Sequence, residues 1–273
     1  MNSKKWMAYP YLIWMAAFII IPLLIIVYYG VTAKEGGGFT LDNITLISNT
    51  INRQALWLSL KLSVISTLIC LVLAYPLAMI LNGMNKKSDS FIVMIFILPM
   101  WMNFLLRTLA WQNILEKTGV INTLLEFLHL PPQTIINTPS AIIFGMVYNF
   151  LPFMVLPIYN VLIKISHDTI DAARDLGANS FQTFIKIILP LSLPGVISGI
   201  TMVFVPSLTT FVISEILGGS KVVLIGNVIE QQFKTMNNWH TGSGLSLVLM
   251  IFILISMAIL AKYDKNPEGK SVW

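Results

Sequence analysis

Charged side chains are scarce in this sequence. Only 11% of its 273 residues are Asp, Glu, Lys or Arg, whereas 56% are hydrophobic and the mean hydropathy is +0.79. A typical soluble domain carries about 25% charged residues. The composition therefore excludes an ordinary soluble domain and indicates a protein that crosses a membrane several times.

The residues that build most enzyme sites are also few or scattered. Cys70 is the single cysteine, which excludes a disulfide framework. The three histidines lie far apart with no paired cysteine, so we expect no metal site. Gly269-Lys-Ser271 has the ending of a phosphate-binding loop, but Asp264 stands where that loop needs glycine. We therefore expect no enzymatic activity and no cofactor in this chain.

Long apolar runs predict an all-α membrane protein with six transmembrane helices. A helix needs about 20 apolar residues to cross the hydrocarbon core. Runs of this kind lie at about residues 9–31, 55–81, 90–111, 140–164, 191–213 and 245–262. We interpret residues 1–273 as one transmembrane permease-like domain. The less hydrophobic stretch from Ile114 to Leu130 is broken by charges and by Pro131-Pro132, so we interpret it as an interfacial helix.

The basic residues predict which side of the membrane each loop occupies. With six spans, four basic groups fall on one side: Lys4 and Lys5; Lys86 and Lys87; Lys164, Arg174 and Lys186; Lys262, Lys265 and Lys270. Short cytoplasmic loops carry an excess of Lys and Arg. We therefore expect both termini to be cytoplasmic. The net charge of +5 suits contact with anionic lipid and is no indication of nucleic-acid binding.

One polar segment, at about residues 166–190, lies between apolar runs on this cytoplasmic side. Thr169 is suited to cap a short helix, and Asp171 lies near the positive end of that helix. Gly177 suits the left-handed residue that closes a helix. Ser180 is then expected to cap a second helix that becomes apolar at Pro190. The segment therefore predicts a helix–turn–helix knob, with Ala172 and Ala173 forming a small face for another protein.

This pattern resembles the EAA loop of ABC-importer permeases. Ala172, Ala173, Gly177 and Pro190 match it in type and spacing, and Asp171 stands where the family usually has Glu. The resemblance implies a type I ABC importer permease fold whose coupling helix docks on a cytoplasmic ATPase. An ordinary amphipathic connector is the alternative interpretation of the same residues.

Other segments are similar to the PotB-type permeases of spermidine/putrescine importers. They are Thr138-Pro-Ser-Ala141, Leu151-Pro-Phe-Met-Val-Leu-Pro157, Gln182-Thr-Phe184 and Leu224-Ile-Gly-Asn-Val-Ile229. The resemblance implies a bacterial plasma-membrane protein that forms half of a translocation path for polyamines. It also implies its partners: a second, different permease subunit, two copies of an ATPase that binds ATP and Mg, and an extracytoplasmic polyamine-binding protein.

A polyamine path needs acidic or carbonyl groups for the ammonium charges and aromatic faces for cation–π contact. Glu215, near the outer end of the fifth span, is the best carboxylate, and Phe211 lies one turn before it on the same face. Weaker polar contacts are expected from Thr209, Tyr148, Asn149 and Asn103. An ion pair of Glu215 with Arg107 or Lys221 is the alternative.

Three other functions fit parts of the sequence. An ABC permease for thiamine, iron or an oxyanion such as sulfate has the same loop, but an anion path favours more basic residues in the spans than Lys61 and Arg107. A secondary transporter requires buried coupling acids or an inverted repeat, and neither is visible. A membrane scaffold has no need of an exposed coupling loop.

Overall fold

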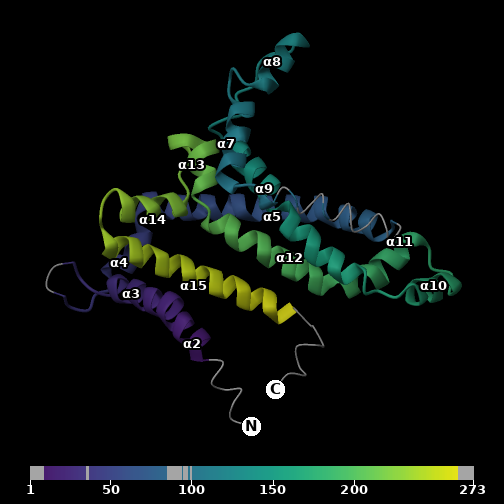
Figure 1. The fold of residues 1–273 in the computed structure, drawn as a ribbon, viewed down its shortest axis with the longest axis horizontal. Helices are drawn as coiled ribbons and strands as arrows, with labels where there is room; N and C mark the ends of the chain where they lie inside the picture. The colour runs from purple at the N-terminus through teal and green to yellow at the C-terminus, as the bar shows by residue number, and fades with distance from the viewer. Residues whose placement is uncertain (1–8, 35–36, 85–93, 95–97, 99, 264–273) are drawn as a thin grey trace. The chain divides into compact units, whose positions relative to one another are not determined.

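The structure is a computed structural model, and it describes residues 9–34, 37–84, 94, 98 and 100–263. The elements named in the described part are all helical, and Figure 1 shows their order along the chain. The chain divides into two compact units. One comprises residues 1–56 and 225–254, the other residues 57–224 and 255–273, and each is described by itself.

The first unit begins with one long apolar helical stretch. It consists of α2 (Tyr9–Met15), the π-helix η1 (Ala16–Ile20) and α3 (Ile21–Gly30). Two short helices follow, α4 (Asp42–Thr45) and η2 (Leu46–Ser48), and then the start of α5 (Thr50–Asn82). The unit is completed by α14 (Ile225–Lys234) and most of α15 (Trp239–Tyr263).

Two glycines allow close contacts within the first unit. A Cβ on Gly30 would meet the side chain of Leu247, and a Cβ on Gly244 would lie 2.5 Å from the carbonyl oxygen of Asn43. The Asn43 Nδ2 donates to the Thr32 carbonyl at 2.9 Å and to the Gly30 carbonyl at 3.3 Å. Small residues and a hydrogen-bonding amide thus hold the loop after α3 against α15, because lipid supplies little hydrophobic force between helices.

The second unit contains the rest of α5 and the polar segment. Its further helices are α7 (Phe104–Leu115), α8 (Val120–Phe127), α9 (Pro139–Leu162), α10 (His167–Asp175), α11 (Ser180–Thr183), η3 (Phe184–Ile188), α12 (Leu189–Thr209), α13 (Val212–Gly218) and η4 (Gly219–Lys221). Its core is apolar and includes Ile142, Met146, Met154 and Ile158 on one helix, α9.

Helices α9 and α12 pack side by side, as Figure 1 also shows. A Cβ on Gly195 would lie 2.7 Å from the Pro157 carbonyl oxygen, and a Cβ on Gly199 would lie 2.7 Å from the Met154 sulfur. The sequence Gly195-Val-Ile-Ser-Gly199 therefore allows the two backbones to approach closely, as the small-xxx-small pattern predicts.

Five helices in the described part are long and apolar enough to cross a membrane. They are Pro10–Gly30, Thr50–Asn82, Pro139–Leu162, Ser180–Thr209 and Trp239–Lys262. Part of the predicted span at residues 90–111, namely 90–93, 95–97 and 99, lies outside the described residues. Its described end is interrupted at Met102 and Asn103, where α7 begins. The count of six spans therefore stays a prediction.

The polar stretch from Ile114 to Leu130 does not form one helix. The last two residues of α7 are Ile114 and Leu115, and the separate helix α8 follows after Gly119. Asn122 joins α8 to the segment that follows it. The Asn122 Nδ2 donates to the Gln133 carbonyl at 3.0 Å, and the Asn122 Oδ1 accepts from the Gln133 N–H at 2.8 Å.

Two π-helical turns precede prolines. The turn η1 comes just before Pro22 and η3 comes just before Pro190. A proline inside an α-helix lacks an N–H and clashes with the carbonyl four residues earlier, and a wider turn relieves that clash. With the wider turn in place, the helical stretch continues through Pro190. It begins at Ser180, earlier than the expected start at about residue 191. Pro190 lies inside this stretch and does not start it.

The predicted fifth span ends earlier than expected, at Thr209. Thr210 has extended backbone angles (φ −64°, ψ 136°), and a new helix, α13, starts after Phe211. The Thr209 hydroxyl donates back to the Val205 carbonyl at 3.1 Å. The sequence had placed Glu215 near the outer end of one continuous span that begins at about residue 191. The break at Thr210 shows that this span is not one continuous helix as far as Glu215.

Candidate coupling loop and substrate path

The polar segment begins with α10, and its cap is one turn earlier than predicted. Ser166, and not Thr169, is the N-cap residue, because the Ser166 Oγ accepts from the Thr169 N–H at 3.3 Å. The two hydroxyls also share a hydrogen bond of 2.8 Å. Asp168 occupies the first turn, where a carboxylate interacts favourably with the helix dipole. Asp171 lies one turn farther along the helix.

Gly177 ends α10 in the left-handed conformation that the sequence predicted, with φ of 85°. Its N–H donates to the Arg174 carbonyl at 2.8 Å, and the Ala178 N–H donates to the Ala173 carbonyl at 3.0 Å. This pair of bonds is the Schellman motif. A Cβ on Gly177 would meet nothing within 4 Å, so the backbone angle alone favours glycine there.

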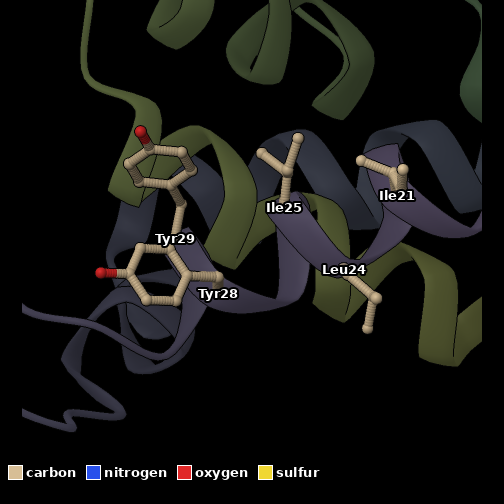
Figure 2. Close-up of a pocket in the computed structure, with 5 residues that line it drawn as sticks. All are labelled: Ile21, Leu24, Ile25, Tyr28 and Tyr29. Carbon is tan, nitrogen blue, oxygen red and sulfur yellow. The ribbon is translucent and has the colours of Figure 1, made fainter. Parts of the chain in front are cut away.

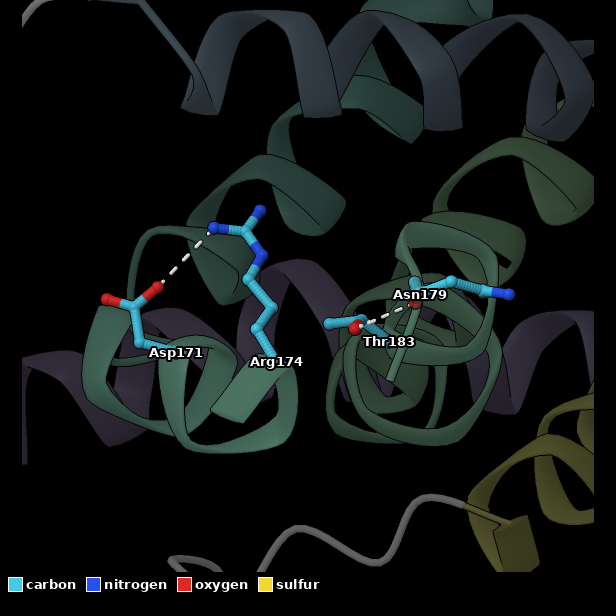
Figure 3. Close-up of polar contacts among 4 residues, drawn as sticks. All are labelled: Asp171, Arg174, Asn179 and Thr183. Atoms are coloured by element: carbon cyan, nitrogen blue, oxygen red, sulfur yellow. Dashed lines mark hydrogen bonds and ion pairs between the residues drawn. The ribbon is translucent and has the colours of Figure 1, made fainter. Parts of the chain in front are cut away.

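The second helix of the segment is capped by Asn179 and not by Ser180. The Asn179 Oδ1 accepts from the Gln182 N–H at 2.8 Å, and the Gln182 Oε1 accepts from the Asn179 N–H at 3.0 Å. This reciprocal pair is a capping box. The Thr183 hydroxyl adds a bond of 3.0 Å to the Asn179 carbonyl (Figure 3). Local bonds therefore fix the turn between α10 and α11.

Helix α10 is poorly covered by the rest of the chain. Ala173 is its one buried residue, whereas Ala172 is exposed, so the two alanines do not form the single face that we expected. Successive residues on a helix point about 100° apart. Leu176 and Phe181, in and after the turn, are 90% and 70% exposed. Two exposed apolar side chains on a capped turn suit a protein partner.

Asp171 and Arg174 form an exposed ion pair on α10. The Arg174 Nη1 lies 3.4 Å from the Asp171 Oδ1, and both side chains are more than half exposed (Figure 3). Pairs of this kind contribute little to stability. The acidic position of the motif therefore faces outward, where a partner can reach it.

The helix that follows the turn is tied to α5. The Tyr75 hydroxyl and the Ser192 Oγ are 2.7 Å apart and buried. The rings of Tyr75 and Phe184 meet edge to face, with centroids 5.5 Å apart. These contacts join η3 and the start of α12 to α5.

Glu215 lies in the first turn of α13 and is exposed. Its N–H donates to the Phe211 carbonyl at 2.9 Å, so the two residues do stand one turn apart. A carboxylate there also interacts favourably with the N-terminus of α13, which gives Glu215 a structural reason to be acidic. The break at Thr210 separates this turn from the long helix α12.

The structure places Tyr148 in a group of aromatic side chains that we call the aromatic cluster: Trp111, Phe144 and Tyr148. The centroid of the Trp111 ring lies 5.1 Å from that of Tyr148 and 4.6 Å from that of Phe144, and both ring pairs meet nearly edge to face. The Arg107 guanidinium lies over the Tyr148 ring, 5.6 Å from its centroid. A cation over a tyrosine face at this distance is a cation–π contact.

The other predicted path residues have local roles. Asn149 is 2% exposed; its Nδ2 donates to the Gly145 carbonyl at 2.8 Å, and its Oδ1 has no hydrogen-bond partner among the described residues. Thr209 bonds to its own helix. The Asn103 Oδ1 accepts from the Leu105 and Leu106 N–H groups and caps α7. These hydrogen bonds all lie within the helix to which each residue belongs or which it caps, and the role of Asn103, Thr209 and Asn149 on a substrate path stays a prediction.

A pocket on the first unit has a different character. Figure 2 shows that it follows one face of α3, and its lining residues are Ile21, Leu24, Ile25, Tyr28 and Tyr29. All five are aliphatic residues or tyrosines, and none of the five is Asp, Glu, Lys or Arg. This surface suits an apolar neighbour and lacks the carboxylate that would attract a polyamine.

A comparison with known families decides the class of protein. The family described as "Binding-protein-dependent transport system inner membrane component" matches residues 71–265. The chain belongs to this family of inner-membrane permeases. It is therefore a multi-pass membrane protein with a transport role.

Individual proteins of this family are similar to the chain over most of its length. The chain is 37% identical to the spermidine/putrescine transport system permease protein PotB of Haemophilus influenzae, over 93% of this chain and 90% of that protein. It is also 37% identical to PotB of Escherichia coli K12, over 90% of this chain and 92% of that protein. A homologue from Mycoplasma genitalium is 27% identical over 84% of this chain and 79% of its own length.

Solved structures share the fold. A chain of a bacterial ABC transporter that imports the acidic polysaccharide alginate superimposes with a TM-score of 0.81 at 17% identity, covering 97% of this chain and 96% of that one. A chain of the MetNI methionine ABC transporter gives 0.52 at 19% identity, covering 78% of this chain and 92% of that one. The all-α ABC importer permease fold predicted from the sequence is confirmed.

Sequence reasoning missed several residues of the site. Trp111 and Phe144 were not singled out. Trp111 stands four residues after the charged residue Arg107, and Phe144 stands four residues before the predicted path residue Tyr148. That spacing places each pair on one helix face. No periodicity shows that the two faces meet, because their contact depends on how α7 packs on α9.

Proposed function

We propose that this chain is the transmembrane permease subunit of an ATP-driven importer for polyamines such as spermidine and putrescine. The observation that carries the proposal is the similarity to PotB proteins at 37% identity over about nine-tenths of the chain. A cation held on an aromatic cluster within the same fold agrees with a cationic substrate.

The proposed assembly contains this chain, a second and different permease subunit, two copies of a cytoplasmic ATPase and an extracytoplasmic polyamine-binding protein. ATP and Mg bind to the ATPase, and this chain performs no catalysis. In this arrangement both termini are cytoplasmic, in a bacterial plasma membrane. The helix α10 docks on the ATPase through the residues of the EAA motif, which are Asp171, Ala172, Ala173, Gly177 and Pro190.

Exposed apolar residues support this docking. Only Ala173 of α10 is buried, and a nine-residue helix is marginal in water without packing. Leu176 and Phe181 therefore supply apolar contact area for a cleft on the ATPase, with Asp171 at the rim. The bond between Tyr75 and Ser192 then carries the movement of the docked helix to α5.

The substrate is tested by uptake of labelled spermidine and putrescine in cells that lack their own polyamine importers. Expression of this chain with its neighbouring transport genes is expected to restore saturable uptake that unlabelled polyamine abolishes. Thiamine, iron and sulfate serve as competitors for the alternative substrates. Uptake that a thiamine excess abolishes and a polyamine excess leaves intact would reject the polyamine assignment.

The coupling surface is tested by the double variant Leu176→Ser, Phe181→Ser. Interface anchors cost about 2 kcal/mol or more when truncated, so the ATPase retained on purification is expected to fall at least tenfold. Exposed apolar residues of α8, Val120 and Leu124, changed to Ser form the matched control. Equal retention of the ATPase by both double variants would contradict docking through this turn.

Glu215 remains the best acidic candidate on the substrate route. Glu215→Gln keeps the size of the side chain and removes its charge. If Glu215 attracts the polycation, polyamine uptake at low concentration is expected to fall severalfold at unchanged membrane abundance. If it acts only on the helix dipole, the change costs about 0.3–1 kcal/mol of stability and leaves uptake at the wild-type rate, which would remove Glu215 from the path.

A further inference from the structure

Arg107 of the second unit is buried, which is uncommon for an arginine. The residue is only 8% exposed, although its side chain ends in a guanidinium group. The guanidinium lies 5.6 Å from the centroid of the Tyr148 ring, and Tyr148 in turn meets the edge of Trp111. The aromatic cluster is thus a cation-binding surface that a protein cation occupies.

The cluster is open on part of its surface. Tyr148 and Phe144 are 36% and 38% exposed, and their rings are nearly parallel with centroids 6.5 Å apart. Tyrosine and tryptophan faces bind ammonium and guanidinium groups through the same attraction. A second cation close to the Arg107 guanidinium would be repelled, and repulsion between like charges a few ångströms apart is strong where water is scarce. A free ammonium can therefore occupy the Tyr148 face only when Arg107 leaves it.

We propose that the aromatic cluster is an ammonium-binding station for the transported cation, and that Arg107 is a tethered competitor that occupies the Tyr148 face when substrate is absent. The proposal rests on the proposed function, because it needs a substrate that carries ammonium groups. It assigns Arg107 a role opposite to that of a binding residue. Arg107 lowers the affinity of the station and returns to it when the substrate leaves.

The proposal has a consequence for selectivity. A monovalent or weakly held cation competes poorly with a guanidinium that is already in place, because the tether keeps its local concentration high. A polyamine carries several ammonium groups on methylene spacers, and the spacers also pack on the partly exposed rings of Phe144 and Trp111. Arg107 therefore favours long polycations over small monovalent amines.

A double-mutant cycle on the assembled transporter tests the competition. Spermidine uptake is measured in wild type, Arg107→Gln, Tyr148→Leu and the double variant, at matched membrane abundance and with the ATPase activity of each assembly recorded. Arg107→Gln is expected to lower the KM for uptake by about two- to thirtyfold, the range for one cation–π contact. Tyr148→Leu is expected to raise the KM, and Tyr148→Phe, which keeps the ring, to leave it within about twofold.

The decisive comparison is the effect of Arg107→Gln in the Tyr148→Leu background, where it is expected to vanish. An unchanged or raised KM in Arg107→Gln, or the same lowering in both backgrounds, overturns the proposal. If Arg107→Gln does not reach the membrane, Arg107→Met, which keeps the aliphatic stem, takes its place in the cycle. Wild-type transporter that carries no polyamine overturns the proposed substrate, whereas polyamine uptake with no coupling between the two positions overturns the competitor role alone.

Discussion

The pair formed by α9 and α12 and the turn from α10 to α11 belong to the same compact unit but are held in place by different forces. The helix pair depends on close packing: Gly195 and Gly199 leave room for the α9 backbone. The turn depends on local hydrogen bonds: a Ser166 cap, a Schellman motif at Gly177 and a capping box at Asn179. A region fixed by its own local hydrogen bonds keeps its shape while its outer surface stays available to a partner.

The largest expected effect lies in the packed pair. Gly195→Val adds side-chain atoms where a Cβ alone already lies 2.7 Å from the Pro157 carbonyl oxygen. Overpacking of this kind costs about 1–3 kcal/mol or more, so the amount of folded protein in the membrane is expected to fall severalfold. The measurement is the quantity of protein extracted as a monodisperse species. Gly38→Val is the control, since nothing lies within 4 Å of a Cβ on Gly38 and its φ is not in the left-handed region. Equal yields would show that the glycine contact is dispensable.

The next largest effect is expected in the turn from α10 to α11, where a substitution should affect coupling more than folding. Gly177→Val puts a β-branched residue at φ of 85°, which costs about 1–2 kcal/mol although space is free around it. The expected result is normal membrane abundance with weaker ATPase retention and slower uptake, because only the knob is misshaped. Gly177→Asn, which tolerates this conformation, is the matched control. A drop in abundance as large as that of Gly195→Val would contradict the separation of the two regions.

A smaller effect is expected from the capping box. Asn179→Ala removes the acceptor for the Gln182 N–H and is expected to cost about 1 kcal/mol of local stability. Hydrogen exchange at the start of α11 measures the loss and is expected to accelerate about fivefold, while amides of α12 are unaffected. Asn179→Asp, which keeps the cap, serves as the comparison. Protection that is unchanged in Asn179→Ala would mean that the box does not hold the turn.

The smallest effect belongs to the exposed ion pair. Arg174→Gln removes the partner of Asp171, and such surface pairs contribute about 0–1 kcal/mol. Stability and abundance are therefore expected to stay at the wild-type level.

Asp171→Glu restores the more usual residue of the motif and is expected to retain uptake. Loss of uptake in Asp171→Ala with stability intact would assign the carboxylate to the partner surface, and full uptake in that variant would remove it from coupling.

Local patterns in the sequence predicted some features and misplaced others nearby. The left-handed Gly177 followed from residue type, because few other residues adopt that backbone region. The caps were displaced, from Thr169 to Ser166 and from Ser180 to Asn179. Ser, Thr and Asn are all competent caps, so where several follow one another the choice depends on which carbonyls and N–H groups the folded turn presents.

The sequence by itself determined that this protein lies in a membrane, that it has the permease fold and that a capped turn closes at Gly177, because long apolar runs and backbone-specific residues act locally. Tertiary structure decided the rest. It ended the long helix at Thr209, buried Asn149, and set Arg107 over Tyr148. These outcomes depend on contacts between α7, α9, α12 and α13, and no local pattern shows which helix faces will meet.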